Sequence, residues 1–132
     1  MDEQRVDGPI ELVLPAEARL VRIARLVASG VATTADYDVE EVEDLRIAVD
    51  EVCSALLEGC DGSPLMLGLE INDRVVTLVG TTGARGVAEF EAQRLALSRQ
   101  ILGVVADDFD ISTDHGQISV RVRKRGTGSV DA

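Results

Sequence analysis

The sequence predicts a two-layer α+β sandwich, with helices covering one face of a mostly antiparallel sheet. Apolar residues recur at helical spacing in three long segments, and they alternate with polar residues in shorter segments between them. The later short segments come in pairs separated by turn residues, which is typical of β-hairpins and therefore of antiparallel strands. Helices on one face of such a sheet form the second layer. A chain of 132 residues suits a single domain with one core.

One strand and two helices are predicted in the first half of the chain. Apolar and polar side chains alternate well enough over residues 10–14 to predict a strand, and the proline that follows ends it. Residues 16–31 repeat apolar side chains at helical spacing and are expected to form the first helix. The second helix is expected to start at residue 39 and to end at 57 or 58, because Asp38 and Glu41 form a capping-box start.

Two hairpins separated by a helix are predicted in the second half. In chain order, we expect a strand at 65–71, a turn at Asn72–Asp73, a strand at 74–79, a glycine-spaced loop at 80–86, a helix at 89–106 and strands at 109–113 and 117–123. The two ends, residues 1–9 and 126–132, are polar and are expected to be flexible. This leaves residues 10–125 as one folded domain.

Composition and charge exclude several classes of function. The chain has 13 Lys and Arg residues against 24 Asp and Glu residues, a net charge of −11, and is expected to repel nucleic acid and anionic membranes. Aromatic residues make up 2%, too few for a base-stacking surface. No apolar run approaches the ~20 residues that cross a bilayer. On one helix Cys53 and Cys60 would lie ~10 Å apart, too far for a disulfide, so we expect a reduced, cytoplasmic protein without a metal site.

An acidic residue deep in the second helix is the first candidate for chemistry. Acids near a helix N-terminus complement its dipole, but Asp50 and Glu51 lie too far along the helix for that role. Glu51 stands between Val49 and Val52, where an acid is an unusual choice for packing. A carboxylate at a buried edge can act as a general base. The structural alternatives are a solvated helix edge or an ion pair, for example with Arg46.

The run from Asp44 to Cys53 resembles the second helix of the anti-sigma-factor serine kinases, a family of the histidine-kinase-like ATPase superfamily. Its sequence, Asp-Leu-Arg-Ile-Ala-Val-Asp-Glu-Val-Cys, is most similar to the actinobacterial anti-sigma-F type. The residues that match the family pattern are Leu45, Arg46, Ala48, Val49 and Glu51. The resemblance covers residues 10–125 in element order, is strongest over 39–57, and implies a histidine-kinase-like, Bergerat-type ATPase fold.

The resemblance also implies a nucleotide site, of which this sequence keeps one part. Glu51 takes the position of the family's general base. The family's Mg²⁺-binding asparagine is replaced by Ala55, which has no side-chain oxygen to offer a cation. The family's Asp-x-Gly-x-Gly turn, whose aspartate binds adenine, is missing, and Thr82 and Gly83 are the remaining candidates for nucleotide contact. Residues 92–98 lack the family's Gly-x-Gly phosphate-binding turn.

Three arginines on the first predicted helix mark a candidate partner surface. Arg19, Arg22 and Arg25 recur every three residues. In the family the first helix helps to form the surface that meets a sigma factor or an anti-anti-sigma protein, and Arg22 lies at the approximate position of a prominent arginine. A basic stripe on an acidic protein suits an acidic patch on a partner, and a solvated helix face is the alternative. His115 lies in a predicted turn without visible partners for metal binding or catalysis.

A short basic run, from Arg121 to Arg125, ends the last predicted strand. On an edge strand such charges prevent pairing with another chain. A contact with acidic groups of a partner is the alternative.

The resemblance implies an anti-sigma factor that binds and sequesters an RNA polymerase sigma factor. The nucleotide site is expected to be degenerate, with no cofactor, and an anti-anti-sigma partner would release the sigma factor by competition. The alternative is an active serine kinase that uses ATP and Mg²⁺, with Glu51 as base, to phosphorylate the anti-anti-sigma protein. The resemblance also suggests a homodimer.

Overall fold

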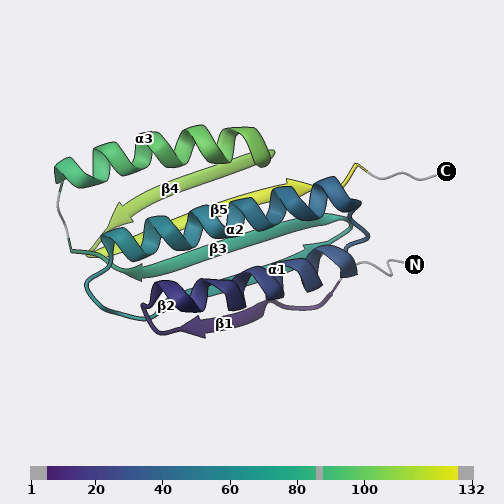
Figure 1. Cartoon of the computed structure of the whole chain (residues 1–132), viewed down its shortest axis with the longest axis horizontal. Helices are drawn as coiled ribbons and strands as arrows, with labels where there is room; N and C mark the ends of the chain where they lie inside the picture. The colour runs from purple at the N-terminus through teal and green to yellow at the C-terminus, as the bar shows by residue number, and fades with distance from the viewer. Residues whose placement is uncertain (1–5, 86–87, 128–132) are drawn as a thin grey trace.

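The computed structural model describes residues 6–85 and 88–127, which form two layers. Figure 1 shows the helices packed side by side over one face of a sheet, with α2 across the middle, α1 along the β1 side and α3 along the β4 side. The elements are β1 (Ile10–Leu14), a short 3-10 turn (Ala18–Leu20), α1 (Val21–Thr34), α2 (Val39–Gly59), β2 (Leu65–Asn72), β3 (Val75–Gly83), α3 (Ala88–Val105), β4 (Asp108–Asp114) and β5 (Gln117–Arg125).

The sheet has the strand order β1-β2-β3-β5-β4, and every neighbouring pair is antiparallel. The predicted α+β sandwich is therefore confirmed. Because β4 returns along the outer side of β5, the basic run of β5 does not lie on an edge strand, and that expectation is wrong. Arg121 and Arg123 instead approach Asp108 of β4, at 3.6 and 3.8 Å.

The core is aliphatic and lies between α2 and the inward face of the sheet. Alternate residues of β2, β3 and β5 point at the helices, as the period of a strand requires. The largest fully buried side chains include Leu45, Leu56, Leu65, Ile71, Leu78 and Leu102. Burying this apolar surface holds α2 rigidly over the sheet centre, which fixes the direction of every polar side chain on that helix.

The predicted glycine loop at residues 80–86 is wrong in its first half, because residues 80–83 continue β3 and pair with β5. Gly80 lies directly under α2. A Cβ built at this position would sit 2.7 Å from Cγ1 of Val52, so only glycine allows the helix to approach the strand this closely. The glycine marks close packing between layers rather than a turn.

The first helix starts and ends later than its apolar pattern predicts. A 3-10 turn precedes it, and it continues past Gly30 to Thr34, where the Thr33 and Thr34 hydroxyls donate to backbone carbonyls one turn earlier. Asp36, with a φ of 62°, then reverses the chain toward α2. The first hairpin turn is also shifted by one residue, to Asp73 and Arg74, which have φ values of 57° and 70°.

Both ends of the described chain are tied to the sheet or to α2. The Val6 amide donates to the Ile71 carbonyl at 3.1 Å. At the other end, the Thr127 amide donates to Oε2 of Glu41 at 2.6 Å, and its hydroxyl donates to the same oxygen. Of the two ends expected to be flexible, residues 1–5 and 128–132 lie outside the described residues.

Candidate functional site

The start of α2 is fixed by reciprocal hydrogen bonds between Asp38 and Glu41. The Glu41 amide donates to Oδ1 of Asp38 at 2.8 Å, and the Asp38 amide donates to Oε1 of Glu41 at 2.9 Å. The predicted capping box is confirmed. Burial raises the pKa of Glu41, but hydrogen bonds from Thr127 and Asp38 and the nearby charge of Lys124 outweigh it, so that this pKa lies below its usual value.

Glu51 lies on the flank of α2 that faces α3, and it is only 7% exposed. Arg94 of α3 approaches Oε2 of Glu51 with Nη2 at 2.9 Å. The Ser98 hydroxyl, one helical turn further along α3, donates to the same oxygen at 2.6 Å. The guanidinium of Arg94 also lies 3.8 Å from Oε1 of Glu58, at the end of α2. Glu51 therefore belongs to a buried polar cluster with Arg94 and Ser98, hereafter the Glu51 cluster.

Arg94 and Ser98 were not predicted from the sequence, which suggested Arg46 as an ion-pair partner of Glu51. Arg46 instead lies 3.2 Å from Glu43 on the same helix. A signal for the true partners was present in the third helix, where Arg94 and Ser98 precede the buried Leu102 at four-residue intervals. Polar residues in register with a buried helical stripe indicate a buried contact.

The Glu51 cluster does not fit the ATP and Mg²⁺ that the resemblance implies. A general base needs a carboxylate that can reach the reacting group, but the Oε2 atom of Glu51 already forms an ion pair with Arg94 and accepts a hydrogen bond from Ser98. Four residues further along α2, the buried side chain at Ala55 offers no ligand atom. Among the described residues, no group of three or more His, Cys, Asp or Glu side chains could hold a metal ion.

Thr82 and Gly83, the other nucleotide candidates, lie at the end of β3 and are occupied by local contacts. The buried hydroxyl of Thr82 lies 3.0 Å from the Pro64 carbonyl and 3.2 Å from that of Ser63. A Cβ at Gly83 would meet the carboxylate of Asp61 at 2.7 Å. Within the described part of the chain, no hydrogen bond or ion pair joins either residue to Glu51.

The three arginines of the candidate partner surface differ in their contacts. Arg19 lies 2.8 Å from Glu17 in an exposed pair, and Nε of Arg25 lies 2.9 Å from Oδ1 of Asp50, which links α1 to α2. Arg22 is exposed and makes no ion pair with any residue that the structure describes.

Large apolar side chains are exposed on both sides of the Arg25–Asp50 pair, near Arg22 on α1 and on the facing part of α2. Leu26, one turn after Arg22, is 72% exposed, and Ile23 beside it is 37% exposed. Ile47 of α2, also 37% exposed, lies one turn before Asp50, which Arg25 contacts. We call Arg22, Ile23, Leu26 and Ile47 the α1–α2 surface.

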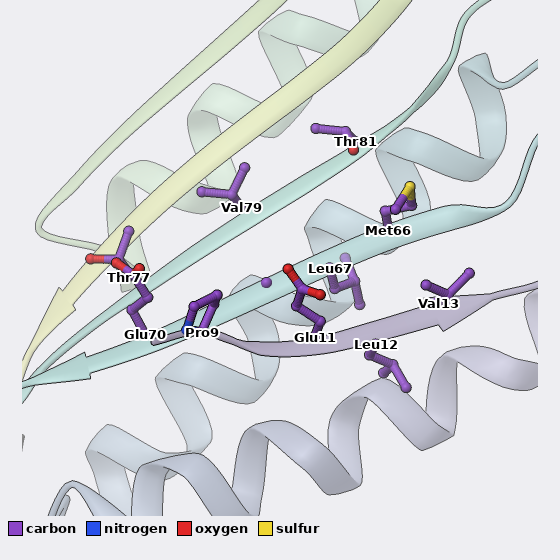
Figure 2. Close-up of a pocket in the computed structure, with 11 residues that line it drawn as sticks. Pro9, Glu11, Leu12, Val13, Met66, Leu67, Glu70, Thr77, Val79 and Thr81 are labelled. Atoms are coloured by element: carbon purple, nitrogen blue, oxygen red, sulfur yellow. The ribbon is translucent and has the colours of Figure 1, made fainter. Parts of the chain in front are cut away.

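The face of the sheet opposite the helices is open and carries a shallow cavity of about 350 Å³ over β1, β2 and β3. Figure 2 shows Val13, Met66 and Val79 on this face, whereas Leu12 and Leu67 point to the other side. Val13 and Met66 are both more than half exposed. Glu11 and Glu70 flank this apolar centre, which we call the open sheet face.

The remaining candidates for chemistry are isolated. Cys53 and Cys60 are both free, and burial raises the pKa of the Cys53 thiol to about 12, so it is a packing residue and not a nucleophile. His115 sits in the exposed turn between β4 and β5, with Nδ1 2.8 Å from Asp114. None of the described helices is long and apolar enough to cross a membrane.

Comparisons with known proteins give consistent relatives. The serine-protein kinase RsbW of Bacillus pumilus is 38% identical over 81 residues, which are 56% of this chain and 50% of that protein. The serine-protein kinase RsbW of Bacillus cereus is 26% identical over 127 residues, 81% of this chain and 79% of that protein. The chain spans about half the length, or less, of the first curated relatives it matches. No family model matches it.

A solved structure shares the fold. The crystal structure of the RsbU and RsbW domains of Rv1364c from Mycobacterium tuberculosis matches with a TM-score of 0.67 at 17% identity, covering 89% of this chain and 32% of that chain. At this identity the likeness shows the fold alone, and the predicted histidine-kinase-like ATPase fold is confirmed.

Proposed function

Because this chain is a relative of the serine-protein kinases RsbW, within the anti-sigma-factor serine kinase family, we propose that it is an anti-sigma factor with a degenerate nucleotide site. It binds an RNA polymerase sigma factor and keeps it from the core enzyme. An anti-anti-sigma protein releases the sigma factor by competing for this chain. The family resemblance predicted from residues 39–57 is confirmed by these relatives, and the role proposed for this chain rests on its own surfaces.

The α1–α2 surface carries the proposal. Exposed apolar side chains beside an arginine without an ion pair among the described residues offer a partner an apolar area to bury and a charge to pair with. Arg22 supplies the charge, and Leu26 supplies the apolar area. The partner surface that fits is apolar and carries an acidic group opposite Arg22. The acidic remainder of this chain steers basic regions of a sigma factor toward it.

The name of the relatives favours an active serine kinase as the second candidate function. Phosphoryl transfer depends on positioning and on a metal ion that neutralises developing charge. In this chain the carboxylate of Glu51 already binds Arg94 and Ser98, and the family's metal-binding asparagine is Ala55. These two observations favour the binding function over the kinase.

Quantified capture from a native lysate tests the proposed function. The tagged chain, without added nucleotide, is expected to retain a sigma factor identified by mass spectrometry. Arg22→Glu and Leu26→Asp are each expected to reduce the amount of captured sigma factor by about tenfold or more. The first variant reverses the charge that faces the partner, and the second places a carboxylate in the apolar contact. Adding the cognate anti-anti-sigma protein is expected to displace the sigma factor.

Matched controls come from α3. Arg99→Glu and Val104→Asp change an exposed arginine and an exposed apolar residue on another helix, and both variants are expected to retain the sigma factor. Retention by Arg22→Glu and Leu26→Asp would exclude the α1–α2 surface. If a captured anti-anti-sigma protein became phosphorylated on addition of ATP and Mg²⁺, the chain would be an active kinase and its nucleotide site would not be degenerate.

The open sheet face is the surface proposed for the homodimer. The register of the sheet places Glu11 of β1 in one row across the strands with Gly68, Val79 and Arg121. Glu70 of β2 lies in a second row with Thr77 and Arg123. Acids of β1 and β2 therefore lie on one side of the apolar centre, and the arginines of β5, which approach Asp108 of β4, lie on the other. When a second copy is turned by a two-fold rotation, its arginines face the acids of the first copy, which gives a self-complementary interface.

Sedimentation velocity tests the dimer. The wild-type chain is expected to sediment as a dimer, and Met66→Lys is expected to give a monomer because it places an ammonium group in the apolar centre. Val104→Lys, at an exposed residue of α3, is expected to leave the dimer intact. A wild-type monomer, or a dimer unaffected by Met66→Lys, would exclude this interface.

A further inference from the structure

Glu51 is joined to α3 by two donors on the same helical stripe. Arg94 and Ser98 are four residues apart, so their side chains point in one direction and meet a single carboxylate oxygen, at 2.9 and 2.6 Å. All three side chains are at least nine-tenths buried, with exposed fractions of 7% for Glu51, 10% for Arg94 and 1% for Ser98. The geometry is that of a buried polar contact between two helices, in which Nε of Arg94 has no hydrogen-bond partner among the described residues.

The described apolar contacts of α3 lie toward its C-terminal end. Leu102 and Val105 are buried, whereas Leu97 is 45% and Val104 is 83% exposed. Because Leu97 faces outward, the buried positions in this part of the helix are those of Arg94 and Ser98. The polar contact with Glu51 therefore holds the part of α3 that precedes Leu102, within the residues whose side chains are described.

We propose that Glu51 is the docking residue of α3, because its buried carboxylate contacts Arg94 and Ser98 and so fixes α3 against α2. While these contacts are made, the carboxylate is not available to a nucleotide. In this role Glu51 positions a helix and performs no chemistry. The assignment goes beyond the proposed anti-sigma function, because it concerns what orders α3 in the chain alone.

Electrostatics makes the two uses of Glu51 mutually exclusive. A buried carboxylate is stable only when its lone pairs are satisfied, and both described donors to Oε2 come from α3. A nucleotide that used Glu51 would have to separate it from Arg94, which would leave a buried guanidinium with only Glu58, at 3.8 Å, nearby. The polyphosphate would also approach a carboxylate without the metal ligand that position 55 would supply.

Native-state hydrogen exchange of the full-length chain tests the docking role. Arg94→Met is expected to raise the exchange rates of amides in residues 94–105 by about tenfold or more, because the unpaired Glu51 carboxylate favours undocking of α3. Amides of β2 and β3 that exchange through local openings, rather than through global unfolding, are expected to change far less. Arg99→Met, an exposed arginine on the same helix, is the matched control and is expected to stay within about twofold of the wild type.

A double variant separates docking from a loss of packing. Glu51→Gln combined with Arg94→Met removes both charges and keeps similar volumes, so the exchange of α3 is expected to return toward the wild-type rate. Unchanged exchange in Arg94→Met, an equal increase in all elements, or no recovery in the double variant would overturn the assignment. Because no partner is present, this result is independent of whether the chain binds a sigma factor.

Discussion

Asp50 and Glu51 are consecutive acids of α2, yet they lie on opposite flanks of the helix in different environments. Asp50 binds Arg25 of α1 at 2.9 Å, with both side chains 40% or more exposed. Glu51 binds Arg94 of α3 at the same distance, with both side chains 10% or less exposed. Water screens the first pair and is excluded from the second, so the same kind of contact has different energetic weight on the two flanks.

The difference between the two flanks of α2 indicates which of them can bind a protein partner. The flank toward α1 carries the half-exposed Arg25–Asp50 pair and the exposed side chains of Leu26 and Ile47, and it can exchange water for a protein surface. On the flank toward α3, Arg94 and Ser98 already contact the buried carboxylate of Glu51. We therefore place partner binding on the first flank and helix docking on the second.

Breaking the buried pair has the largest expected effect on stability. Arg94→Met leaves the Glu51 carboxylate buried with Ser98 as its remaining described donor, and we expect it to lower the free energy of unfolding by about 3–5 kcal/mol. Chemical denaturation followed by circular dichroism measures this value. A loss below about 1 kcal/mol would mean that the pair behaves as an exposed one.

The acid at the start of α2 has a smaller effect that depends on pH. The folded-state pKa of Glu41 is lowered, so the carboxylate contributes stability above its unfolded pKa and loses this contribution as the pH falls through the folded pKa. At neutral pH, Glu41→Gln is expected to lower the free energy of unfolding by about 1 kcal/mol. The difference from the wild type should shrink below pH 4.5, the ordinary pKa of this group. Urea denaturation at several pH values measures it, and a difference that grows in acid would contradict the assignment.

The exposed pair has the smallest expected effect. Arg25→Ala leaves Asp50 open to water, and we expect a change in the free energy of unfolding of less than about 1 kcal/mol. The same denaturation experiment, run beside Arg94→Met, compares the two flanks directly. Equal losses for the two variants would show that burial does not distinguish them.

The sequence predicted the contacts that are local and left out those that join distant elements. The capping box was predictable because Asp38 and Glu41 are three residues apart and carry a recognisable pattern. The partner of Glu51 lies 43 or more residues away on a helix whose packing face a single sequence does not define. Gly80 was assigned to a loop because its role depends on contact with Val52, in another layer.

Titration calorimetry of the wild-type chain with ATP and Mg²⁺ tests whether the site around Glu51 binds a nucleotide. With the carboxylate of Glu51 engaged by Arg94 and no metal ligand at position 55, no binding is expected at ATP concentrations up to about 1 mM. Capture of the sigma factor is expected to be the same with and without the nucleotide. A dissociation constant in the micromolar range, accompanied by transfer of phosphate to an anti-anti-sigma protein, would contradict the account.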